Sequence, residues 1–387
     1  MSDALTKYRE ELYCCSRCGT CKYIYQNYSD SCPAGKKFQF ETFYPSGRLH
    51  IARGLLEGKI EWSERIRDIL FSCPTCASCT VNCQSRHHIL IVDIIEALRA
   101  EAVSKGFGPL PNQKAFAESI EKEHNPYKEQ HDHRLDWKKG IESEVPQKDK
   151  ASILFFVGCT SSYRQKDLAQ ATVKLLNKLG VDYTVSEEEW CCGSPLIRTG
   201  QLDLVKGLIE HNLELIKRTG ANTVITSCAG CYRTLKLDYP HYAQKLEGVE
   251  ILHITEFLQK MIKERKLKLK RLDAKITYHD PCHLGRHAGI YEAPRAVIQA
   301  IPGVSLIEMA RNKQNAWCCG AGGGVKAGFK DWAVEISNDR IKEAEETACD
   351  ILVSACPFCK TNLQDAISAS NSKLRLMDIV NLLNDLI

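Results

Sequence analysis

The sequence has little that would place the protein outside a cell or within a membrane. Its 387 residues contain no apolar run long enough to span a bilayer. The first residues, MSDALTKYREEL, are polar and lack the apolar core of a secretory signal. We therefore expect a cytoplasmic protein, with peripheral docking on the cytoplasmic face of a membrane complex as the alternative.

The chain also has little net charge and no nucleotide-binding motif. Its formal charge of +4 gives no case for nucleic acid as a partner. The full phosphate-loop pattern G-x-x-x-x-G-K-[ST] is absent, and no flavin or nicotinamide site can be defended. Any redox chemistry would therefore need a partner subunit.

Cysteine, in contrast, is abundant, with 20 residues. Disulfide-dense proteins are usually short, secreted and poor in core residues. This chain is long, lacks an export signal and has ample aliphatic residues. Its cysteines occur in C-x-x-C and C-x-x-C-x-x-C groups, a spacing typical of metal clusters. The sequence therefore predicts a metal protein and not a disulfide framework.

The first predicted domain, residues 1–105, contains two cysteine runs. In two-cluster ferredoxins the fourth cysteine of each run ligates the other cluster, so the pattern predicts two cubane [4Fe-4S] clusters. One takes Cys15, Cys18, Cys21 and Cys83, and the other takes Cys73, Cys76, Cys79 and Cys32. Apolar residues between the runs recur at helical spacing, which indicates a helical domain. Two structural zinc sites are the alternative.

Residues 106–150 are rich in charge, histidine and proline, with poor periodicity. They predict a charged linker, or a segment that wraps around the next domain. Three of their histidines lack ligand spacing and are predicted to lie in a solvated loop: His124, His131 and His133.

Two further domains of one plan are predicted over residues 151–260 and 261–387, because strand and helix patterns alternate in both. The predicted strands are ASILFFVGC, VDYTV and NTVITSC in the first domain, and AKITYHDPC, VSLIEM and DILVSACPFC in the second. The closing segments TNLQDAISAS and LRLMDIVNLLNDLI are predicted to be helical. The fold class is therefore α+β multidomain, with a helical ferredoxin-like domain ahead of two repeated Rossmann-like α/β domains with parallel sheets.

Each α/β domain contains five cysteines in one order: a lone cysteine, an adjacent pair followed by glycine, and a C-x-x-C pair. The first set is Cys159, Cys191, Cys192, Cys228 and Cys231, and the second is Cys282, Cys318, Cys319, Cys356 and Cys359. Several follow predicted strands, where ligands bind in such sheets. Five thiolates, two of them adjacent, do not suit a compact cube, so the pattern favours an opened cluster. Gly193 and Gly320 would let the backbone approach closely or adopt positive φ.

This repeat, the HDPCHLGR and CCGAGGG stretches and the cysteine block ahead of them resemble the fused catalytic subunit of heterodisulfide reductases. The resemblance covers nearly the whole chain apart from residues 106–150. It implies that each complete set of five cysteines holds a non-cubane four-iron cluster and is catalytic. One repeat in such proteins has also been considered a zinc site, so zinc in the first α/β domain remains an alternative.

The resemblance further implies how the protein works. Single electrons would pass through the cubanes, and a small-molecule or protein disulfide between the two open clusters would be reduced or formed. The redox partner would be a flavoprotein, a membrane cytochrome b-type subunit or an electron-bifurcating subunit. The layout is also similar to iron–sulfur subunits of glycolate, lactate and glycerol-3-phosphate dehydrogenases and of class II benzoyl-CoA reductase, which would relay electrons without a disulfide substrate. Two complete cysteine sets favour the reductase.

A few potential ligands remain outside these sets. Cys14 and Cys349 are predicted not to be ligands, with Cys349 in the core on an apolar helix face. Three histidines flank the strand that ends at Cys282, as a proton donor or as hydrogen-bonding supports: His279, His283 and His287. Two more follow Cys83 and are predicted at the surface or supporting the ligands: His87 and His88.

Overall fold

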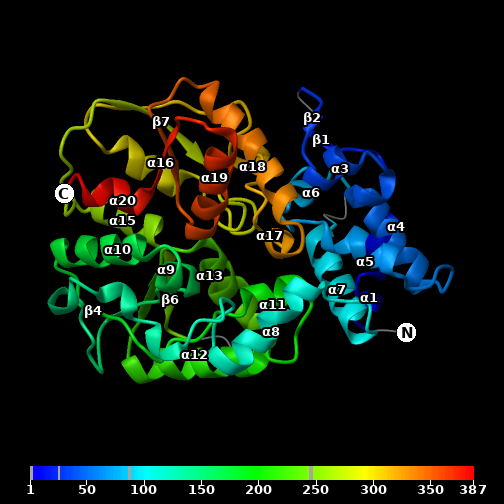
Figure 1. The fold of residues 1–387 in the computed structure, drawn as a ribbon, viewed down its shortest axis with the longest axis horizontal. Helices are drawn as coiled ribbons and strands as arrows, with labels where there is room; N and C mark the ends of the chain where they lie inside the picture. The colour runs from blue at the N-terminus through cyan, green and yellow to red at the C-terminus, as the bar shows by residue number, and fades with distance from the viewer. Residues whose placement is uncertain (1–2, 25–26, 86–88, 244–246) are drawn as a thin grey trace.

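The computed structural model describes residues 3–24, 27–85, 89–243 and 247–387, so the predictions for His87 and His88 lie outside the described residues. The N-terminal domain, blue in Figure 1, lies beside two α/β domains that stack on each other. Within the described ranges, no helix combines the length and the apolar character needed to cross a membrane.

The N-terminal domain is helical, as predicted, apart from a short antiparallel pair. Its helices are α1 (Asp3–Thr6), α2 (Arg9–Cys14), α3 (Pro33–Phe38), α4 (Pro45–Leu56), α5 (Glu64–Phe71), α6 (Ser78–Val81) and α7 (Ile91–Ser104), with the 3-10 turn η1 (Glu41–Phe43) and the strands β1 (Tyr23–Ile24) and β2 (Ser29–Asp30). Proline at the first position sets where α3 and α4 begin, and Ser63 caps α5 by accepting a hydrogen bond from Ile66 N.

The segment 106–150 wraps around the first α/β domain. It forms α8 (Pro111–Glu123) and the 3-10 turns η2 (His131–His133), η3 (Asp136–Lys138) and η4 (Glu142–Glu144). Trp137 is 1% exposed and belongs to the hydrophobic core of the α/β domains. The poor periodicity of this segment in the sequence reflects its short turns.

Both α/β domains contain a four-stranded parallel sheet with the same strand order, which confirms the predicted fold class. The first has the order β4-β3-β5-β6 and the second the order β8-β7-β9-β10. The strands are β3 (Ile153–Phe155), β4 (Tyr183–Thr184), β5 (Thr223–Thr226), β6 (Glu250–His253), β7 (Ala274–His279), β8 (Val304–Leu306), β9 (Ile351–Ser354) and β10 (Arg375–Asp378).

Helices cover these sheets at equivalent places. The first domain has α9 (Cys159–Tyr163), α10 (Lys166–Lys178), α11 (Ser194–Thr199), α12 (Val205–Thr219), α13 (Ala229–Arg233), the π-helical turn η5 (Thr234–Asp238), α14 (Tyr239–Tyr242) and α15 (Ile254–Lys263). The second has α16 (Glu292–Gln299), the 3-10 turn η6 (Lys313–Asn315), α17 (Val325–Gly328), α18 (Lys330–Glu345), α19 (Pro357–Ser370) and α20 (Ile379–Asn384). The predicted domain boundaries remain predictions, and α15 extends past residue 260.

One predicted helix is wrong at its start. The segment LRLMDIVNLLNDLI begins as the edge strand β10, which pairs in parallel with β9, and α20 starts only at Ile379. Asp378 ends the strand and caps the helix by accepting a hydrogen bond from Val380 N at 3.0 Å. The matching edge strand of the first domain, β6, was also not predicted from the sequence.

The two α/β domains are related by an approximate two-fold arrangement. Helix α10 packs on α20, and α15 packs on α16. Since α10 and α16 follow the first strands of their domains, and α15 and α20 follow the last strands, these two contacts are equivalent. The arrangement turns the cysteine-bearing edges of the two sheets toward each other (Figure 1).

Candidate metal centres

The first N-terminal group of cysteines, Cys15, Cys18, Cys21 and Cys83, lies at the surface of the domain. Cys18 is exposed, Cys15 and Cys83 are half-buried, and only Cys21 is buried. The four are brought together, because Cys15 interacts electrostatically with Cys18 and Cys83, and Cys21 interacts with Cys15 and Cys83. Burial raises the pKa of the Cys21 thiol to about 11.

The second group, Cys32, Cys73, Cys76 and Cys79, is entirely buried. Cys32 and Cys79 each interact with Cys73 and Cys76, and burial raises the pKa of the Cys32 thiol to about 12. Backbone N–H groups point at the sulfur atoms: Gly35 N donates to Cys32 Sγ, and Thr75 N donates to Cys73 Sγ, both at 3.4 Å. Such N–H donors stabilise thiolates and suit iron–sulfur ligation.

The five cysteines of the first α/β domain meet at the carboxyl ends of its strands. Cys159 begins α9 after β3, the adjacent pair lies between β4 and α11, Cys228 follows β5, and Cys231 lies in α13. All five are buried. Each thiol interacts with the next one in the spatial order Cys159, Cys191, Cys192, Cys231, Cys228. Gly193 has φ of 89°, as expected for the glycine after the pair.

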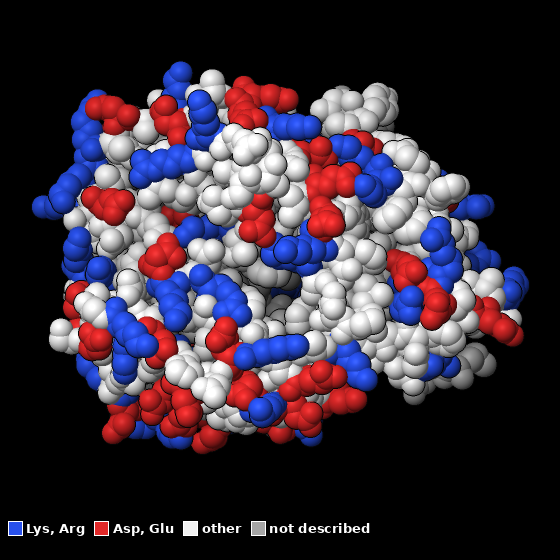
Figure 2. Space-filling model, viewed as in Figure 1, with Lys and Arg blue, Asp and Glu red and all other residues white. Residues whose placement is uncertain are grey.

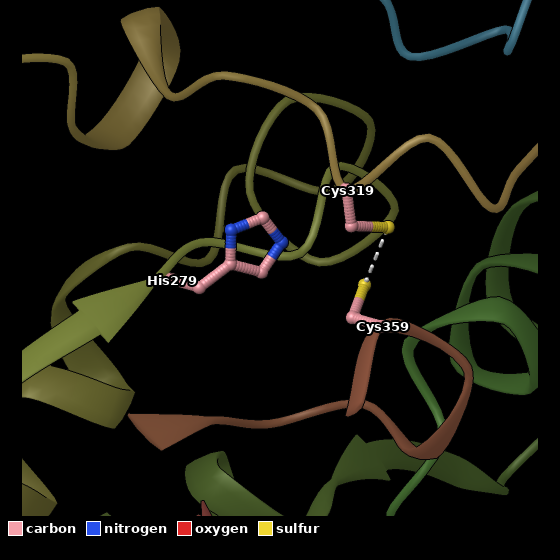
Figure 3. A group of neighbouring side chains, drawn as sticks. All are labelled: His279, Cys319 and Cys359. Atoms are coloured by element: carbon pink, nitrogen blue, oxygen red, sulfur yellow. Dashed lines mark hydrogen bonds between the residues drawn. The ribbon is translucent and has the colours of Figure 1, made fainter. Parts of the chain in front are cut away.

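The second set is built in the same way. The sulfur atoms of Cys319 and Cys359 lie 3.3 Å apart (Figure 3), and Gly320 N donates to Cys318 Sγ at 3.3 Å. Gly320 has φ of 79°, and a Cβ atom there would lie 2.6 Å from Ala333 O, so only glycine fits. The sequence thus identified residues that come together in both domains.

Both sets open into one cavity between the α/β domains. Its wall includes cysteines of both sets together with apolar side chains, among them Phe116, Tyr127 and Phe358. Cys228 and Cys356 interact directly across the interface. The face of the molecule in Figure 2 is hollowed near its centre, and Lys and Arg side chains gather around this hollow.

The second N-terminal group lies against the second α/β set. The thiols of Cys76 and Cys318 interact, and this hydrogen bond is the main cause that lowers the pKa of Cys76 to about 6. The glycine loop after Cys319 brings the two backbones together, since Cβ atoms on Gly322 and Gly323 would lie 2.8 Å from Pro74 O and 2.5 Å from Cys73 O. The sequence predicted a close backbone approach at this loop but not its partner.

The four groups therefore form a continuous series. Cys79 lies within electrostatic range of Cys21 of the surface group, Cys76 contacts the second α/β set, and that set contacts the first. The series runs from the exposed Cys18 to the cavity.

The three histidines near Cys282 have different positions. His287 Nε2 donates to Thr75 O at 2.9 Å, so it joins the N-terminal domain to the second α/β domain. His283 lines the cavity, and burial lowers its pKa well below the usual value, so its ring is neutral. His279 forms a group with Cys319 and Cys359 whose potential ligand atoms all lie within 4.8 Å of one another (Figure 3).

A buried ion pair at the first set was not predicted from the sequence. Arg134, from the segment 106–150, pairs with Glu189, and both of its terminal nitrogens lie 3.8 Å from Cys159 Sγ. Glu189 also accepts hydrogen bonds from Val157 N at 2.7 Å and Gly158 N at 2.9 Å. Nothing in the sequence distinguished Arg134 from the neighbouring charged residues.

One prediction about a residue outside these sets is wrong. Cys349 is half-buried in the turn between α18 and β9, not on a helix face, and its thiol donates to Ala344 O at 3.6 Å. His124 is half-buried just past α8, and its ring stacks on Trp190 at 3.7 Å. His133 is exposed and pairs with Asp136.

Comparison with known proteins agrees with this arrangement. The family of cysteine-rich CCG domains matches residues 153–236 and 276–364, and the 4Fe-4S dicluster domain family matches residues 11–87. A subunit of the dihydromethanophenazine:CoB–CoM heterodisulfide reductase of Methanosarcina barkeri is 43% identical over 96% of this chain and 93% of its own length. The chain belongs to the family of these heterodisulfide reductase subunits. It is therefore an iron–sulfur oxidoreductase subunit with an N-terminal dicluster domain and two CCG domains.

More distant proteins are similar to this chain in sequence or in fold. The EtfAB:quinone oxidoreductase of Syntrophomonas wolfei is 33% identical over 82% of this chain, which spans only 46% of that relative. A hypothetical protein from Helicobacter pylori has a similar fold, with a TM-score of 0.53 at 11% identity, covering 99% of this chain and 72% of the other.

Proposed function

We propose that this chain reduces or forms a disulfide in the cavity between its two CCG domains, with electrons supplied through its N-terminal domain. The observation that supports this proposal most is the shared cavity, into which cysteines of both five-residue sets open. A relay of electrons alone needs no such cavity at the end of the series. Cleaving a disulfide takes two electrons, whereas each carrier supplies one. Two centres that face one substrate can therefore supply both electrons.

The cysteine groups would hold four clusters. The two N-terminal groups would hold cubane [4Fe-4S] clusters, and each set of five would hold a non-cubane four-iron cluster, which supplies single electrons and accessible iron when bound. Buried thiols with backbone N–H donors at Cys32, Cys73, Cys191 and Cys318 suit such clusters. The alternative of zinc in the first CCG domain uses four of the same thiols.

The protein side chains would bind and shield the substrate. Phe116, Tyr127 and Phe358 give the cavity apolar walls, which exclude water from a reacting sulfur. Arg233 Nη1 lies 3.4 Å from His283 Nε2. The same Nη1 also lies 3.4 Å from His287 Nε2, which donates to Thr75 O, so this contact does not select a tautomer of His283. His283 lines the cavity, where a ring N–H can hydrogen-bond a substrate sulfur.

A redox partner would dock where the series reaches the surface. Cys18 is exposed, and the two other accessible cysteines of its group, Cys15 and Cys83, are half-buried. A flavoprotein, a cytochrome b-type membrane subunit or an electron-bifurcating subunit would deliver or receive electrons there. Only the cytochrome b-type partner would place this chain at a membrane, as a peripheral subunit.

The test is anaerobic purification followed by metal analysis and turnover. About sixteen iron atoms, no zinc and oxidation of a reduced viologen dye by the CoB–CoM heterodisulfide, named in the Methanosarcina relative, support the proposal. Cystine serves as the comparison disulfide. About eight irons with zinc would contradict the four-cluster assignment. Full iron without turnover of either disulfide would make the chain an electron relay, as in the flavin-linked alternative.

A further inference from the structure

His279 lies at the end of β7 in a fully buried polar arrangement. It is 1% exposed, and Arg340 from α18, 0% exposed, donates from Nε to His279 Nδ1 at 3.2 Å. Arg340 is itself fixed, since its Nη1 donates to Arg311 O at 2.8 Å and to Glu343 at 2.7 Å. The guanidinium is therefore held in place by groups other than the histidine.

This hydrogen bond determines which imidazole nitrogen carries the proton. An arginine side chain has donors and no acceptor, so His279 Nδ1 must accept. In the neutral ring the single proton then lies on Nε2. The arginine thus selects the Nε2–H tautomer.

The Nε2–H group points toward the second cysteine set. Figure 3 shows the far nitrogen of the His279 ring turned toward the sulfur atoms of Cys319 and Cys359, and the three potential ligand atoms lie within 4.8 Å of one another. His279 Nε2 is buried and has no hydrogen-bond partner among the described residues. A buried N–H without an acceptor is unfavourable, so an acceptor is needed at this position. The free thiols of Cys319 and Cys359 lie near Nε2 but do not accept a hydrogen bond from it.

The same three residues resemble a His–Cys–Cys metal site, but the arginine argues against that assignment. A metal-binding imidazole uses the lone pair of one nitrogen and donates its other N–H to a carbonyl or carboxylate. Here the outer partner of His279 is a donor, so Nε2 has no free lone pair. His279 therefore suits hydrogen bonding to sulfur and not coordination.

At the matching position, the first CCG domain has no such donor. Counting back three residues from the lone cysteine gives His279 before Cys282 and Phe156 before Cys159. Phe156 is fully buried, so an apolar ring takes the place of the imidazole. The first set has the Arg134 cation beside Cys159 instead. The two otherwise repeated centres are thus surrounded differently.

We propose that His279, held in its Nε2–H form by Arg340, donates a hydrogen bond to sulfur at the second CCG centre and makes that centre easier to reduce. The inference rests on the proposed four-cluster assignment. A donor aimed at sulfur stabilises the more negative, reduced state, so it raises the reduction potential. The second centre is the one that contacts Cys76, so the bond favours electron input at the step from the N-terminal domain.

The test compares His279→Phe, the residue of the first domain, with His279→Gln, which keeps an N–H donor. Each holoprotein is titrated anaerobically while cluster signals are followed by electron paramagnetic resonance. In His279→Phe we expect unchanged iron content and one signal shifted to lower potential. An expected tenfold loss in the equilibrium constant for reduction corresponds to about 59 mV for one electron. The Gln variant should recover part of the shift, and Arg340→Met should show an intermediate one.

Two results would overturn the inference. One is an unshifted set of signals in His279→Phe, and the other is loss of about four irons, which would make His279 a ligand. Should His279→Phe fold poorly, the Arg340→Met comparison still decides, since this change leaves the imidazole in place and removes the donor that selects its tautomer, together with that donor's bonds to Arg311 O and Glu343. The wild-type iron count tests the proposed function separately, so the two failures are distinguishable.

Discussion

The thiols of Cys228 and Cys356 interact across the interface between the two CCG domains. Each is the first cysteine of its C-x-x-C pair and follows the equivalent strand, β5 or β9. The approximate two-fold arrangement therefore brings equivalent cysteines of the two sets into contact. A substrate bound in the cavity, as we propose, would be reached from both sets at once, which two independent domains would not allow.

Replacing Cys356 by serine should abolish disulfide turnover, because this thiol faces both centres. We expect the loss of up to about four of about sixteen irons, with the N-terminal clusters retained. Cys349→Ser is the matched control, since that half-buried thiol lies in the turn before β9 of the same domain. Iron analysis and dye-linked turnover check the prediction. Equal iron loss in the control would contradict the ligand assignment.

Arg99 should stabilise the packing of the three domains against one another. Its guanidinium is 0% exposed and donates to four backbone oxygens, which belong to all three domains: Leu70 O, Cys73 O, Arg198 O and Gly323 O. Arg99→Met leaves these acceptors without their donor. Hydrogen bonds to charged groups contribute about 1.5–3 kcal/mol each, so we expect a loss of at least about 3 kcal/mol.

Anaerobic thermal melts at a fixed scan rate measure the Arg99 effect, and limited proteolysis between the domains gives a second readout. Arg271→Met is the control, because the Arg271 side chain is 69% exposed and pairs with Asp273. Exposed pairs contribute about 0–1 kcal/mol. An Arg99→Met protein as stable and protease-resistant as this control would contradict the assigned role.

Cysteine spacing predicted which cysteines come together. Covalent neighbours such as Cys191 and Cys192 must share a site, and thiols at the carboxyl ends of parallel strands converge because the sheet places them there. The repeated order of strands and cysteines predicted two like domains, and the parallel sheets are confirmed. The local sequence pattern was sufficient to predict a feature wherever that feature depends on residues close together in the sequence.

The remaining features depend on contacts that no local pattern encodes. Arg134 reaches Glu189 across 55 positions of sequence, and Arg286 of the second CCG domain donates to Cys76 O across 210. The edge strand β10 was predicted as helix because its apolar residues run directly into α20, and only pairing with β9 makes it a strand. The tautomer of His279 likewise depends on Arg340, 61 residues away.

The Arg134–Glu189 pair should be important for stability, whereas its sequence neighbour should not. Both partners are at most 2% exposed, while Glu188, which pairs with Arg218, is 52% exposed. Glu189→Gln removes one charge from a buried pair, which typically costs about 3–5 kcal/mol because the other charge is left uncompensated. Glu188→Gln should cost about 0–1 kcal/mol. Anaerobic melting temperatures check the contrast, and equal values would contradict it.

Asp378 should make the folded protein less stable as pH rises. Burial raises its pKa to about 8, against about 3.9 for an unperturbed aspartate in an unfolded chain. Between about pH 4 and 8 the folded state keeps this proton while the unfolded state loses it, so stability falls with pH by at most about 1.4 kcal/mol per unit. Above the folded pKa both states are ionised and the decline ends.

Asp378→Asn should remove this contribution. An asparagine oxygen can still accept from Val380 N, so the start of α20 is preserved, and the neutral amide has no ionisation penalty. We expect the variant to gain stability over the wild type progressively from pH 5 to pH 8, measured as the difference in anaerobic melting temperature. Asp385→Asn, at an exposed position just past α20, serves as the control. A constant difference across this range would show that Asp378 is already ionised at pH 5 in the folded protein.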